Sequence, residues 1–329
     1  MRIAVTGANG HVGVNLCKAL LTLNHEVRAL AHHNIQELQG LPLELVNGDV
    51  LDYQSLKIFL KDIDVVYHLA ARISITGDSE GLVSKTNANG TQNILNAAIE
   101  CKVKRFIHFS SIHAFRQKPN DSLLDETRPL VDSEGFAYDL SKATGERYVN
   151  QAVKNGLDAV ILSPTAIFGP MDPQPSLVGS AVLQLYYNKI PALVPGGYNW
   201  VDVRDVVSGA ISAMQRGRTG EKYLLAGHWH TLKELSALIQ EYTGKNTVKT
   251  VLPFWVARVG LPFITAYSML SKSKPLYTSE SLTIIGEGNK MISHTKAQNE
   301  LGFCPRPFAE TIRDLLEYFK LNGYIPNAK

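Results

Sequence analysis

Cysteine is scarce in this chain of 329 residues, and the three that occur, Cys17, Cys101 and Cys304, lie far apart. No pair has the C-x-x-C spacing, and no cluster of cysteine and histidine is present in the sequence. The pattern excludes a disulfide framework and gives no support to a metal site such as structural zinc. It is typical of a protein from a reducing compartment.

An excess of one charge sign is also absent. Lysine and arginine number 33 and aspartate and glutamate 30, so the formal net charge is +3. This balance argues against a protein that coats nucleic acid and against an acid-rich disordered chain, and we expect no nucleic-acid partner. Charged residues make up only 19% of the chain and hydrophobic residues 45%, which predicts a sizeable core and apolar surface inside or at a binding site.

Long uninterrupted apolar segments are lacking too. The N-terminal sequence MRIAVTGANG reaches a glycine turn before any long apolar stretch, so we expect no signal peptide and a cytoplasmic protein. Residues 251–270 carry one charge, Arg258, but Pro253 and Pro262 interrupt them, so a membrane-spanning helix is not expected. We favour a buried or lid helix over an apolar pocket; the alternative is peripheral contact with a membrane surface or with a partner subunit.

Short apolar runs alternate with helical periodicity along the first half of the chain. Strands are expected at residues 3–6, 27–31, 43–46, 65–69, 103–109 and 159–162, and helices at 52–60, 86–100 and 136–155. This order predicts an α/β fold with a parallel sheet covered on both faces. A loop rich in proline and glycine at 169–175 ends the alternation. Further elements are expected at 199–215, 223–225, 231–243 and 308–321.

The sequence TGANGHVG follows the first strand and opens a helix. Gly7 permits a tight turn, Gly10 lets the backbone approach a pyrophosphate, and Gly13 lets the helix pack closely on the sheet. The phosphates then lie at the positive end of the helix dipole. We expect the turn to bind a dinucleotide through Thr6, Gly7, Asn9, Gly10, His11, Val12 and Gly13. Residues 1–165 then form an NAD(P)-binding Rossmann core, a doubly wound parallel sheet, and residues 166–329 are a mixed segment. Within that segment, about 196–225 return to the core and the rest forms a smaller substrate-capping lobe.

The end of the second strand separates NAD from NADP. Enzymes that use NAD commonly place an acid there, which binds the ribose 2′-hydroxyl. This chain has Ala31, His32 and His33 at that point and Arg28 earlier in the strand. Since no acid is present and cationic side chains are available, we expect this end of the strand to accept the 2′-phosphate of NADP. We therefore favour NADP, with NAD as the alternative, and we assign Arg28 and His32 to the cofactor site. Asp49, after the third strand, is placed to accept a hydrogen bond from the adenine amine.

Tyr138 and Lys142 are four residues apart, which puts them on one face of a helix. A phenol with a pKa of ~10 is a poor acid or base at neutral pH. The lysine cation and a positive nicotinamide ring are expected to lower that pKa, so that Tyr138 exchanges a proton with a substrate oxygen. Ser110 and Ser111 end the fifth strand, 27 residues before the tyrosine when counted from Ser111, and a hydroxyl there can hold a substrate carbonyl.

Together these motifs resemble the extended short-chain dehydrogenase/reductase superfamily and, within it, the NAD-dependent epimerase/dehydratase family. The resemblance covers nearly the whole chain. Within the superfamily, the sequence is most similar to the branch of dihydroflavonol-4-reductase-like and 3β-hydroxysteroid-dehydrogenase-like proteins. The segments that carry it are TGANGHVG (6–13), NGDV (47–50), YHLAA (67–71), NANGTQNIL (87–95), FSS (109–111), YDLSK (138–142), SPTAIFGP (163–170), GGYNWVDVRDVVSGAISAM (196–214) and AQNELGFCPRPFAETIRDLLEYF (297–319).

The resemblance implies roles for individual residues. Ser111 would be the catalytic hydroxyl, Tyr138 the general acid/base, Lys142 the ligand of the nicotinamide ribose, and Asn87 a support of the active site. The remaining residues that it assigns to the cofactor channel are Asp49 and Val50 at the adenine, Leu69, Ala70, Ala71 and Ser110 along the channel, and Pro164, Thr165 and Ile167 beside the nicotinamide. Ile112, His113 and Tyr198 are the candidate substrate contacts.

Departures from the family pattern narrow the reaction. Sugar-nucleotide dehydratases carry Asp-Glu after the active-site hydroxyl, where this chain has Ile112 and His113, which argues against dehydration. Tyr198 stands where sugar-nucleotide enzymes usually carry an arginine that clamps the diphosphate. Ser163 replaces an arginine that is frequent before the following proline. His228 and His230 have no third ligand in their neighbourhood, and we expect no metal.

The leading hypothesis is an NAD(P)-dependent oxidoreductase that transfers a hydride between nicotinamide and a ketone or secondary alcohol of a small, largely apolar substrate. The alternatives are a nucleotide-sugar epimerase with tightly bound NAD and a non-catalytic protein that reports redox state to partners. The resemblance allows either a monomer or a homodimer, since helices corresponding to 86–100 and 136–155 form the dimer bundle in many relatives.

Overall fold

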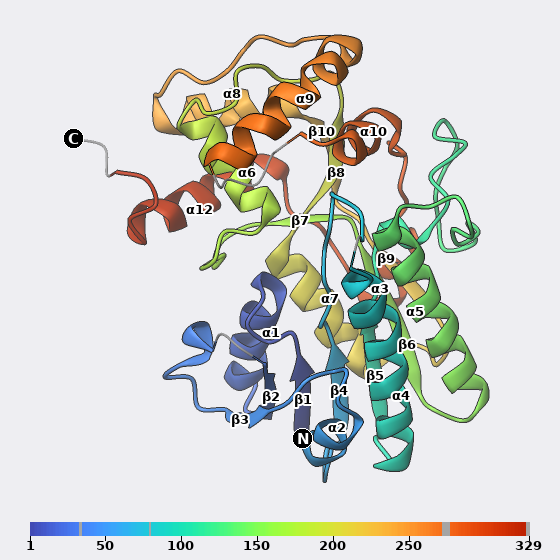
Figure 1. The fold of residues 1–329 in the computed structure, drawn as a ribbon. Coiled ribbons are helices and arrows are strands. Elements are labelled where there is room, and N and C mark those ends of the chain that lie inside the picture. Colours follow the sequence, from blue (N-terminus) through green and yellow to red (C-terminus); the bar gives the residue numbers. More distant parts are fainter. Residues whose placement is uncertain (33–34, 79, 272–276, 327–329) are drawn as a thin grey trace.

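The computed structural model describes residues 1–32, 35–78, 80–271 and 277–326, with backbone only for 263–271. Its core is a seven-stranded parallel sheet with the strand order β3-β2-β1-β4-β5-β6-β9 (Figure 1). The strands are β1 Arg2–Thr6, β2 Glu26–Ala31, β3 Glu44–Asn47, β4 Val65–His68, β5 Arg105–Phe109, β6 Ala159–Pro164 and β9 Lys222–Leu225. The expected Rossmann-type sheet is thus confirmed, because the order reverses next to β1, as it does in doubly wound dinucleotide-binding folds.

Helices cover both faces of this sheet. One face packs on α1 His11–Thr22, α7 Val203–Arg216 and α11 Thr295–Leu301, and the other on α2 Tyr53–Phe59, α4 Gly90–Glu100 and α5 Ala137–Lys154. Side chains on the central strands are buried on both faces, which is why these strands are continuously apolar in sequence. The helix expected over 86–100 begins instead with a π-helical turn, Lys85–Asn89, after the short α3, Leu82–Ser84.

The second half of the chain builds a lobe above the carboxyl edge of the sheet (Figure 1). A three-stranded sheet, β10-β8-β7, joins β7 Ala166–Phe168, β8 Gly197–Asp202 and β10 His228–Thr231. Its helices are α6 Leu177–Tyr186, α8 Leu232–Thr243, α9 Phe254–Ser271, α10 Ser279–Glu287 and α12 Phe308–Leu321. Between about 196 and 225, α7 and β9 join the core, whereas β8 belongs to the small sheet. That segment therefore connects the two parts of the molecule.

The apolar run at 251–270 differs from the expectation in two respects. Pro253 precedes α9, but Pro262 lies inside the helix and does not end it. The helix is not wholly buried either, since Phe254, Ala257 and Leu261 pack against the core of the lobe while Trp255 and Val259 are exposed. In the described part of the chain, no helix has the length and apolarity to cross a membrane.

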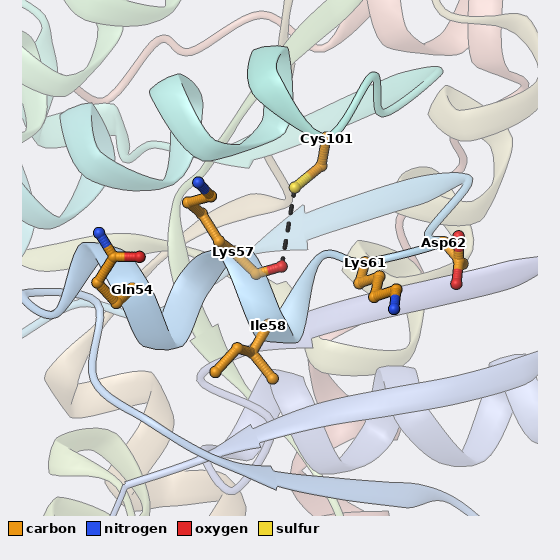
Figure 2. Close-up of a pocket in the computed structure, with 6 residues that line it drawn as sticks. All are labelled: Gln54, Lys57, Ile58, Lys61, Asp62 and Cys101. Carbon is orange, nitrogen blue, oxygen red and sulfur yellow. Dashed lines mark hydrogen bonds between the residues drawn. The ribbon is translucent and has the colours of Figure 1, made fainter.

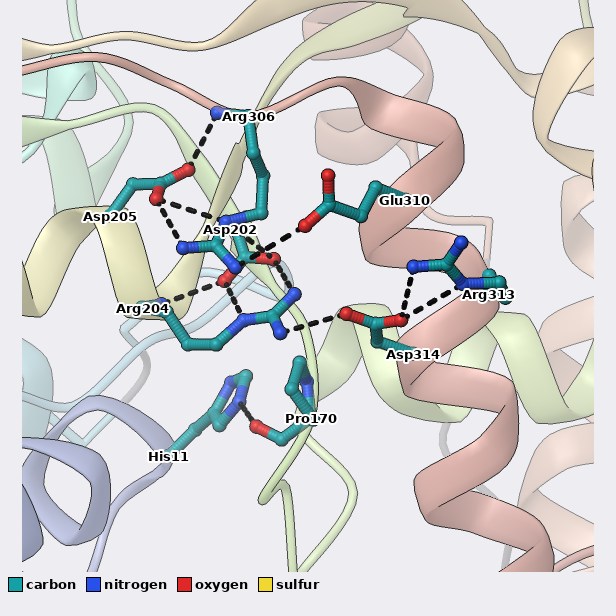
Figure 3. A network of polar contacts seen from close by, with 9 residues as sticks. All are labelled: His11, Pro170, Asp202, Arg204, Asp205, Arg306, Glu310, Arg313 and Asp314. Carbon is teal, nitrogen blue, oxygen red and sulfur yellow. Dashed lines mark hydrogen bonds and ion pairs between the residues drawn. The ribbon is translucent and has the colours of Figure 1, made fainter.

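An arginine–aspartate network fixes the lobe to the core at the start of α7 (Figure 3). The Arg204 guanidinium donates to both carboxylate oxygens of Asp202, at 3.0 and 2.7 Å, and to Asp314 of α12 at 2.8 Å. Arg306 donates to Asp205 at 3.0 and 2.7 Å. Because Asp202 and Asp205 are buried, these paired charges tie α12 and the chain before it to the first turn of α7.

Candidate active site

The glycine turn between β1 and α1 has the geometry that only glycine permits. Gly7 has a φ of +67°, and a Cβ there would lie 2.8 Å from the backbone nitrogen of Ala70. A Cβ on Gly13 would lie 2.2 Å from the carbonyl oxygen of Gly7. Gly10, the residue before α1, has no side chain to cap the helix, so the first amides of α1 are not occupied by a cap. The cradle therefore fits the pyrophosphate of a dinucleotide.

Two polar side chains of the turn have hydrogen-bond partners within the chain. The hydroxyl of Thr6 is buried, hydrogen-bonds to His68 Nδ1 at 2.8 Å and accepts from the amide of Ala70 at 3.1 Å. The Nε2 of His11 donates to the carbonyl oxygen of Pro170 at 3.0 Å (Figure 3). Thr6 thus joins the ends of β1 and β4, and the His11 side chain joins the turn to the loop after β7.

A close contact between His32 and Asp49 joins the ends of β2 and β3. His32 Nε2 lies 2.9 Å from Asp49 Oδ2, and Asp49 Oδ1 accepts from the amide of Leu51 at 2.9 Å. The next residue, Val50, is buried and lies against Gly90 of α4. His32 and Asp49 are therefore brought together, and neither is buried, so both are open to a ligand at this edge.

Arg28, which we assigned to the cofactor site, is not brought there. Its guanidinium pairs with Glu44 at 2.7 Å and donates to the carbonyl oxygens of Phe59 and Lys61 at 2.9 and 2.8 Å. Those carbonyls precede β4, at the amino edge of the sheet, opposite the glycine turn. The residue's position in the strand gave no indication of which edge its long side chain would reach.

Ser111, Tyr138 and Lys142 come together at the carboxyl edge. Burial raises the pKa of the Tyr138 phenol and the nearby Ser111 hydroxyl opposes that rise, while the Ser111 oxygen accepts from the amide of His113 at 3.2 Å. Lys142 Nζ lies 6.0 Å from the centroid of the Tyr138 ring and donates to the carbonyl oxygen of Phe109 at 2.9 Å. The first turns of α5 thus direct the phenol and the ammonium to the end of β5.

Burial governs the pKa values of Tyr138 and Lys142 in the chain by itself. Burial is the largest influence on Tyr138 and raises its pKa to about 12, with the Asp139 carboxylate adding to the rise. Burial also lowers the pKa of Lys142 to about 8, against the opposing effect of Glu146. In the chain by itself Tyr138 is consequently a neutral acid at pH 7, and Lys142 is a cation close to its titration point. The expected lowering is not produced by the lysine alone.

Asn87 is buried and connects α5 with the loop after β4. Its Oδ1 accepts from the amide of Arg72 at 2.7 Å, and its Nδ2 donates to the carbonyl of Arg72 at 3.0 Å and to the Ser141 hydroxyl at 2.9 Å. The buried amide therefore connects the loop after β4 with α5. That loop contains Leu69, Ala70 and Ala71, which follow the end of β4 at the same edge of the sheet.

Glu146 is the residue of this site that the sequence analysis missed. It is fully buried on α5, one turn after Lys142, where its Oε1 accepts from Ser110 at 2.5 Å and from Ser163 at 3.4 Å. Its Oε2 pairs with Lys222 of β9 at 2.9 Å. Ser110 therefore points at Glu146 rather than at the cofactor channel, and the unusual Ser163 has a partner. The spacing Tyr138, Lys142, Glu146 on one helix face was the available signal.

Three further residues predicted beside the nicotinamide lie where β6 is followed by β7. Pro164 ends β6, Thr165 follows it, and Ile167 packs against the core of the parallel sheet from β7. The Thr165 hydroxyl is buried without a hydrogen-bond partner among the described residues. A buried hydroxyl in that state has the free capacity to bind a polar ligand group at this edge.

His113 is the predicted substrate residue that lies closest to the chemistry. Its ring is edge-on to the Tyr138 ring at 5.9 Å, and its Nδ1 lies 3.3 Å from the Asp139 carboxylate. Glu280, in the first turn of α10, is buried and acts electrostatically with both His113 and Asp139. This charged group, partly from the lobe, was not foreseen because α10 was not predicted.

The other two predicted substrate residues, Ile112 and Tyr198, lie in different parts of the molecule. Ile112 is buried in a short 3-10 turn, Ile112–Ala114, directly after Ser111. Tyr198 packs in the core of the lobe with its ring 5.2 Å from that of Trp200, and burial raises its pKa. Ile112 thus lies at the catalytic edge, and Tyr198 contributes to the lobe that covers it.

Two surface hollows lie elsewhere. One of about 390 Å³ is lined by residues of α2 and its surroundings, namely Gln54, Lys57, Ile58, Lys61, Asp62 and Cys101 (Figure 2). The other, of about 560 Å³, is lined by His228, His230, Glu234, Ala237, Leu238, Pro307, Phe308 and Ala309. His230 there stacks on Phe308 at 4.3 Å. Among the residues that the structure describes, no group of three or more potential ligands is arranged to hold a metal ion.

Comparisons with known proteins agree with this geometry. The model of the NAD-dependent epimerase/dehydratase family matches residues 3–226. Sterol demethylase protein B of Methylococcus capsulatus is 30% identical over 99% of this chain and 100% of its own. A putative dihydroflavonol 4-reductase of Synechocystis is 31% identical over 98% of this chain and 95% of its own. The crystal structure of gox2253 superimposes with a TM-score of 0.85 at 29% identity, covering 98% of this chain and 99% of that one.

Proposed function

The chain belongs to the NAD-dependent epimerase/dehydratase family and is an NAD(P)-dependent reductase or dehydrogenase of the extended short-chain type, and we propose that it interconverts a ketone and a secondary alcohol on a small, largely apolar molecule. The observation that carries the proposal is the meeting of Ser111, Tyr138 and Lys142 at the edge of the sheet where the glycine turn opens. The relatives named as a reductase and as a sterol demethylase protein support a carbonyl or alcohol on an apolar molecule.

In the proposed reaction, Ser111, Tyr138 and Lys142 have different roles. A bound nicotinamide would supply or accept the hydride. Ser111 donates a hydrogen bond to the substrate oxygen and holds it beside the phenol. In the reducing direction Tyr138 gives its proton to that oxygen, and in the oxidising direction it takes the proton back. Lys142 holds a positive charge next to the phenol and so stabilises the phenolate that is formed.

For the cofactor we propose NADP. The support is the absence of an acid at the end of β2, where the exposed His32 stands. Arg28 gives no support, because its guanidinium is engaged at the opposite edge. Titration with NADPH and NADH, followed by quenching of protein fluorescence, tests this choice directly, and tighter binding of NADH would overturn it.

The experiment that tests the function is a spectrophotometric screen. Purified protein is mixed with NADPH and a panel of apolar ketones, and oxidation of the nicotinamide is followed. We expect turnover with part of the panel and none with sugar nucleotides. Protein that is purified with NAD already bound, and that inverts a sugar nucleotide without added cofactor, would instead establish the epimerase.

The proposal extends to location and assembly. We propose a cytoplasmic enzyme, since its three cysteines are all free and are spaced as in proteins of reducing compartments. It acts as a monomer or a homodimer, which sedimentation velocity of the purified chain would distinguish.

A further inference from the structure

The outward face of α9 is an exposed apolar surface. Trp255 is 70% exposed and Val259 67% exposed, although both are large hydrophobic residues. They are four positions apart, so they are neighbours on one side of the helix, while Phe254 and Leu261 pack inward. Val251, just before the helix, is exposed as well. Contiguous apolar side chains on a surface mark a place of contact with another phase or molecule.

The sequence on both sides of this face carries charges of a single sign. From Tyr242 to Ser279 the chain contains no aspartate or glutamate; the acids that bound this stretch in sequence are Glu241 and Glu280. Within it, Lys249 and Arg258 are exposed on either side of Trp255. A stretch of 38 residues without an acid is unusual in a chain where 30 of 329 residues are acidic.

A neighbouring segment also presents exposed aromatic and basic side chains. Residues 186–193 lie beside 245–252, since the amide of Leu193 donates to Thr250 at 2.9 Å and that of Leu252 donates to Leu193 at 2.8 Å. This segment presents the exposed Tyr187 and Lys189, and Lys245 lies 4.9 Å from the Tyr187 ring. We use the name α9 surface for Tyr187, Lys189, Lys245, Lys249, Val251, Trp255, Arg258 and Val259.

We propose that the α9 surface binds the face of an anionic lipid membrane. Tryptophan and tyrosine favour the headgroup level of a bilayer, and lysine and arginine beside them are attracted to anionic lipids. The helix lies in the lobe, far from the amino edge of the parallel sheet (Figure 1), so it can rest on a bilayer while the core stays in water. A second copy of the chain fits less well, because a two-fold contact would bring these cations against one another.

Vesicle binding tests the proposal without cofactor or substrate, so its outcome is independent of the proposed reaction. The full chain is floated with vesicles of phosphatidylcholine alone or mixed with phosphatidylglycerol. We expect the bound fraction to be several-fold larger on the anionic vesicles and to fall at high salt. On those vesicles, Trp255→Phe should also lose a blue shift of fluorescence that the wild type shows.

Two variants and a matched control decide the outcome. Trp255→Ser/Val259→Ser should reduce binding at least about tenfold, and Lys249→Glu/Arg258→Glu should abolish the preference for anionic vesicles. Ile58→Ser is the control. Ile58 is also 67% exposed, but it lies on α2, which packs on the parallel sheet and is not part of the lobe. Equal binding to both kinds of vesicle, or binding that the first variant does not change, would refute the proposal. So would self-association of the wild type that the same variant removes, since a second copy would then be the occupant.

Discussion

Two helices of equal length, α5 and α9, show opposite exceptions to the rule that apolar residues lie inside and polar residues outside. Each has 18 residues. α5 turns Ser141, Lys142 and Glu146 into the protein, whereas α9 turns Trp255 and Val259 out of it. Buried polar groups are destabilising unless they are paired, and exposed large apolar groups are unusual unless they are covered. Each helix therefore marks, by its exception, where the molecule meets something else.

The difference lies in where the partners come from. The polar groups of α5 find theirs inside the chain: Lys142 at Phe109, Glu146 at Ser110 and Lys222. Lys142 and Glu146 are thus engaged within the chain, whereas the Tyr138 hydroxyl, next to Ser111, has a proton that the proposed reaction can use. Among the residues that the structure describes, none covers Trp255 or Val259, and the partner proposed for them comes from outside the chain. Substitutions that separate these two cases should act on different properties of the protein.

The largest effect is expected from Tyr138→Phe. The phenol is the one proton donor that the proposed reaction uses at the substrate oxygen, so turnover should fall by about 10²–10⁴-fold. Binding of NADPH should be retained, since the glycine turn and Lys142 are unchanged. Steady-state kinetics and a cofactor titration measure the two quantities. Turnover close to that of the wild type would show that α5 does not supply the proton donor. The proposed difference between a reactive α5 and a membrane-binding α9 would then fail.

Lys142→Met tests whether burial of the ammonium destabilises the fold. The folded pKa of about 8 is below the ordinary 10.5, so the unfolded chain binds more protons between these values and stability rises with pH. The penalty is fully present below pH 8 and amounts to roughly 3 kcal/mol. Urea unfolding of the wild type from pH 7.5 to about 9.5 should show the rise, and Lys142→Met should lack it. An identical pH dependence in both proteins would mean that the ammonium is not buried as described.

Glu146→Gln should move the same titration in the acid direction. The carboxylate raises the pKa of Lys142, so its removal should make the ammonium lose its proton at a lower pH. The alkaline limb of the pH–rate profile should then shift downward, by an amount that kinetics at several pH values gives directly. Ser163→Ala is the matched control, since it removes a neutral contact of Glu146 but no charge. A lower rate with an unmoved profile would show that Glu146 only supports the fold.

The sequence predicted the parts of this site that depend on neighbours along the chain. The glycine turn, the spacing of Tyr138 and Lys142, and the end of β5 at Ser111 are local patterns, and the structure brings them to one edge. Glu146 could not be assigned in the same way, because its partners come from β5, β6 and β9 and only the folded sheet brings them together.

One expectation is wrong, and another was made for a site that also holds the cofactor. Arg28 was placed at the cofactor because its strand leads there, but a long side chain can reach back to the opposite edge. The lowered tyrosine pKa was inferred from the lysine cation together with a bound nicotinamide ring, and for that loaded site it stays a prediction. In the chain alone burial, which the sequence does not give for a single position, has the larger influence.

The smallest effect is expected on the outward face of α9, and it completes the contrast between the helices. Trp255→Ser removes a side chain that is 70% exposed, so the free energy of unfolding should change by less than about 0.5 kcal/mol. Phe254→Ser, one residue earlier, removes a ring that packs against the lobe core and should cost more than about 1 kcal/mol. Urea titrations of the two variants in the absence of lipid measure both values. If Trp255→Ser destabilises the chain as much as Phe254→Ser, the tryptophan is held by the chain's own residues, and the exception shown by α9 is one of packing rather than of contact with a membrane.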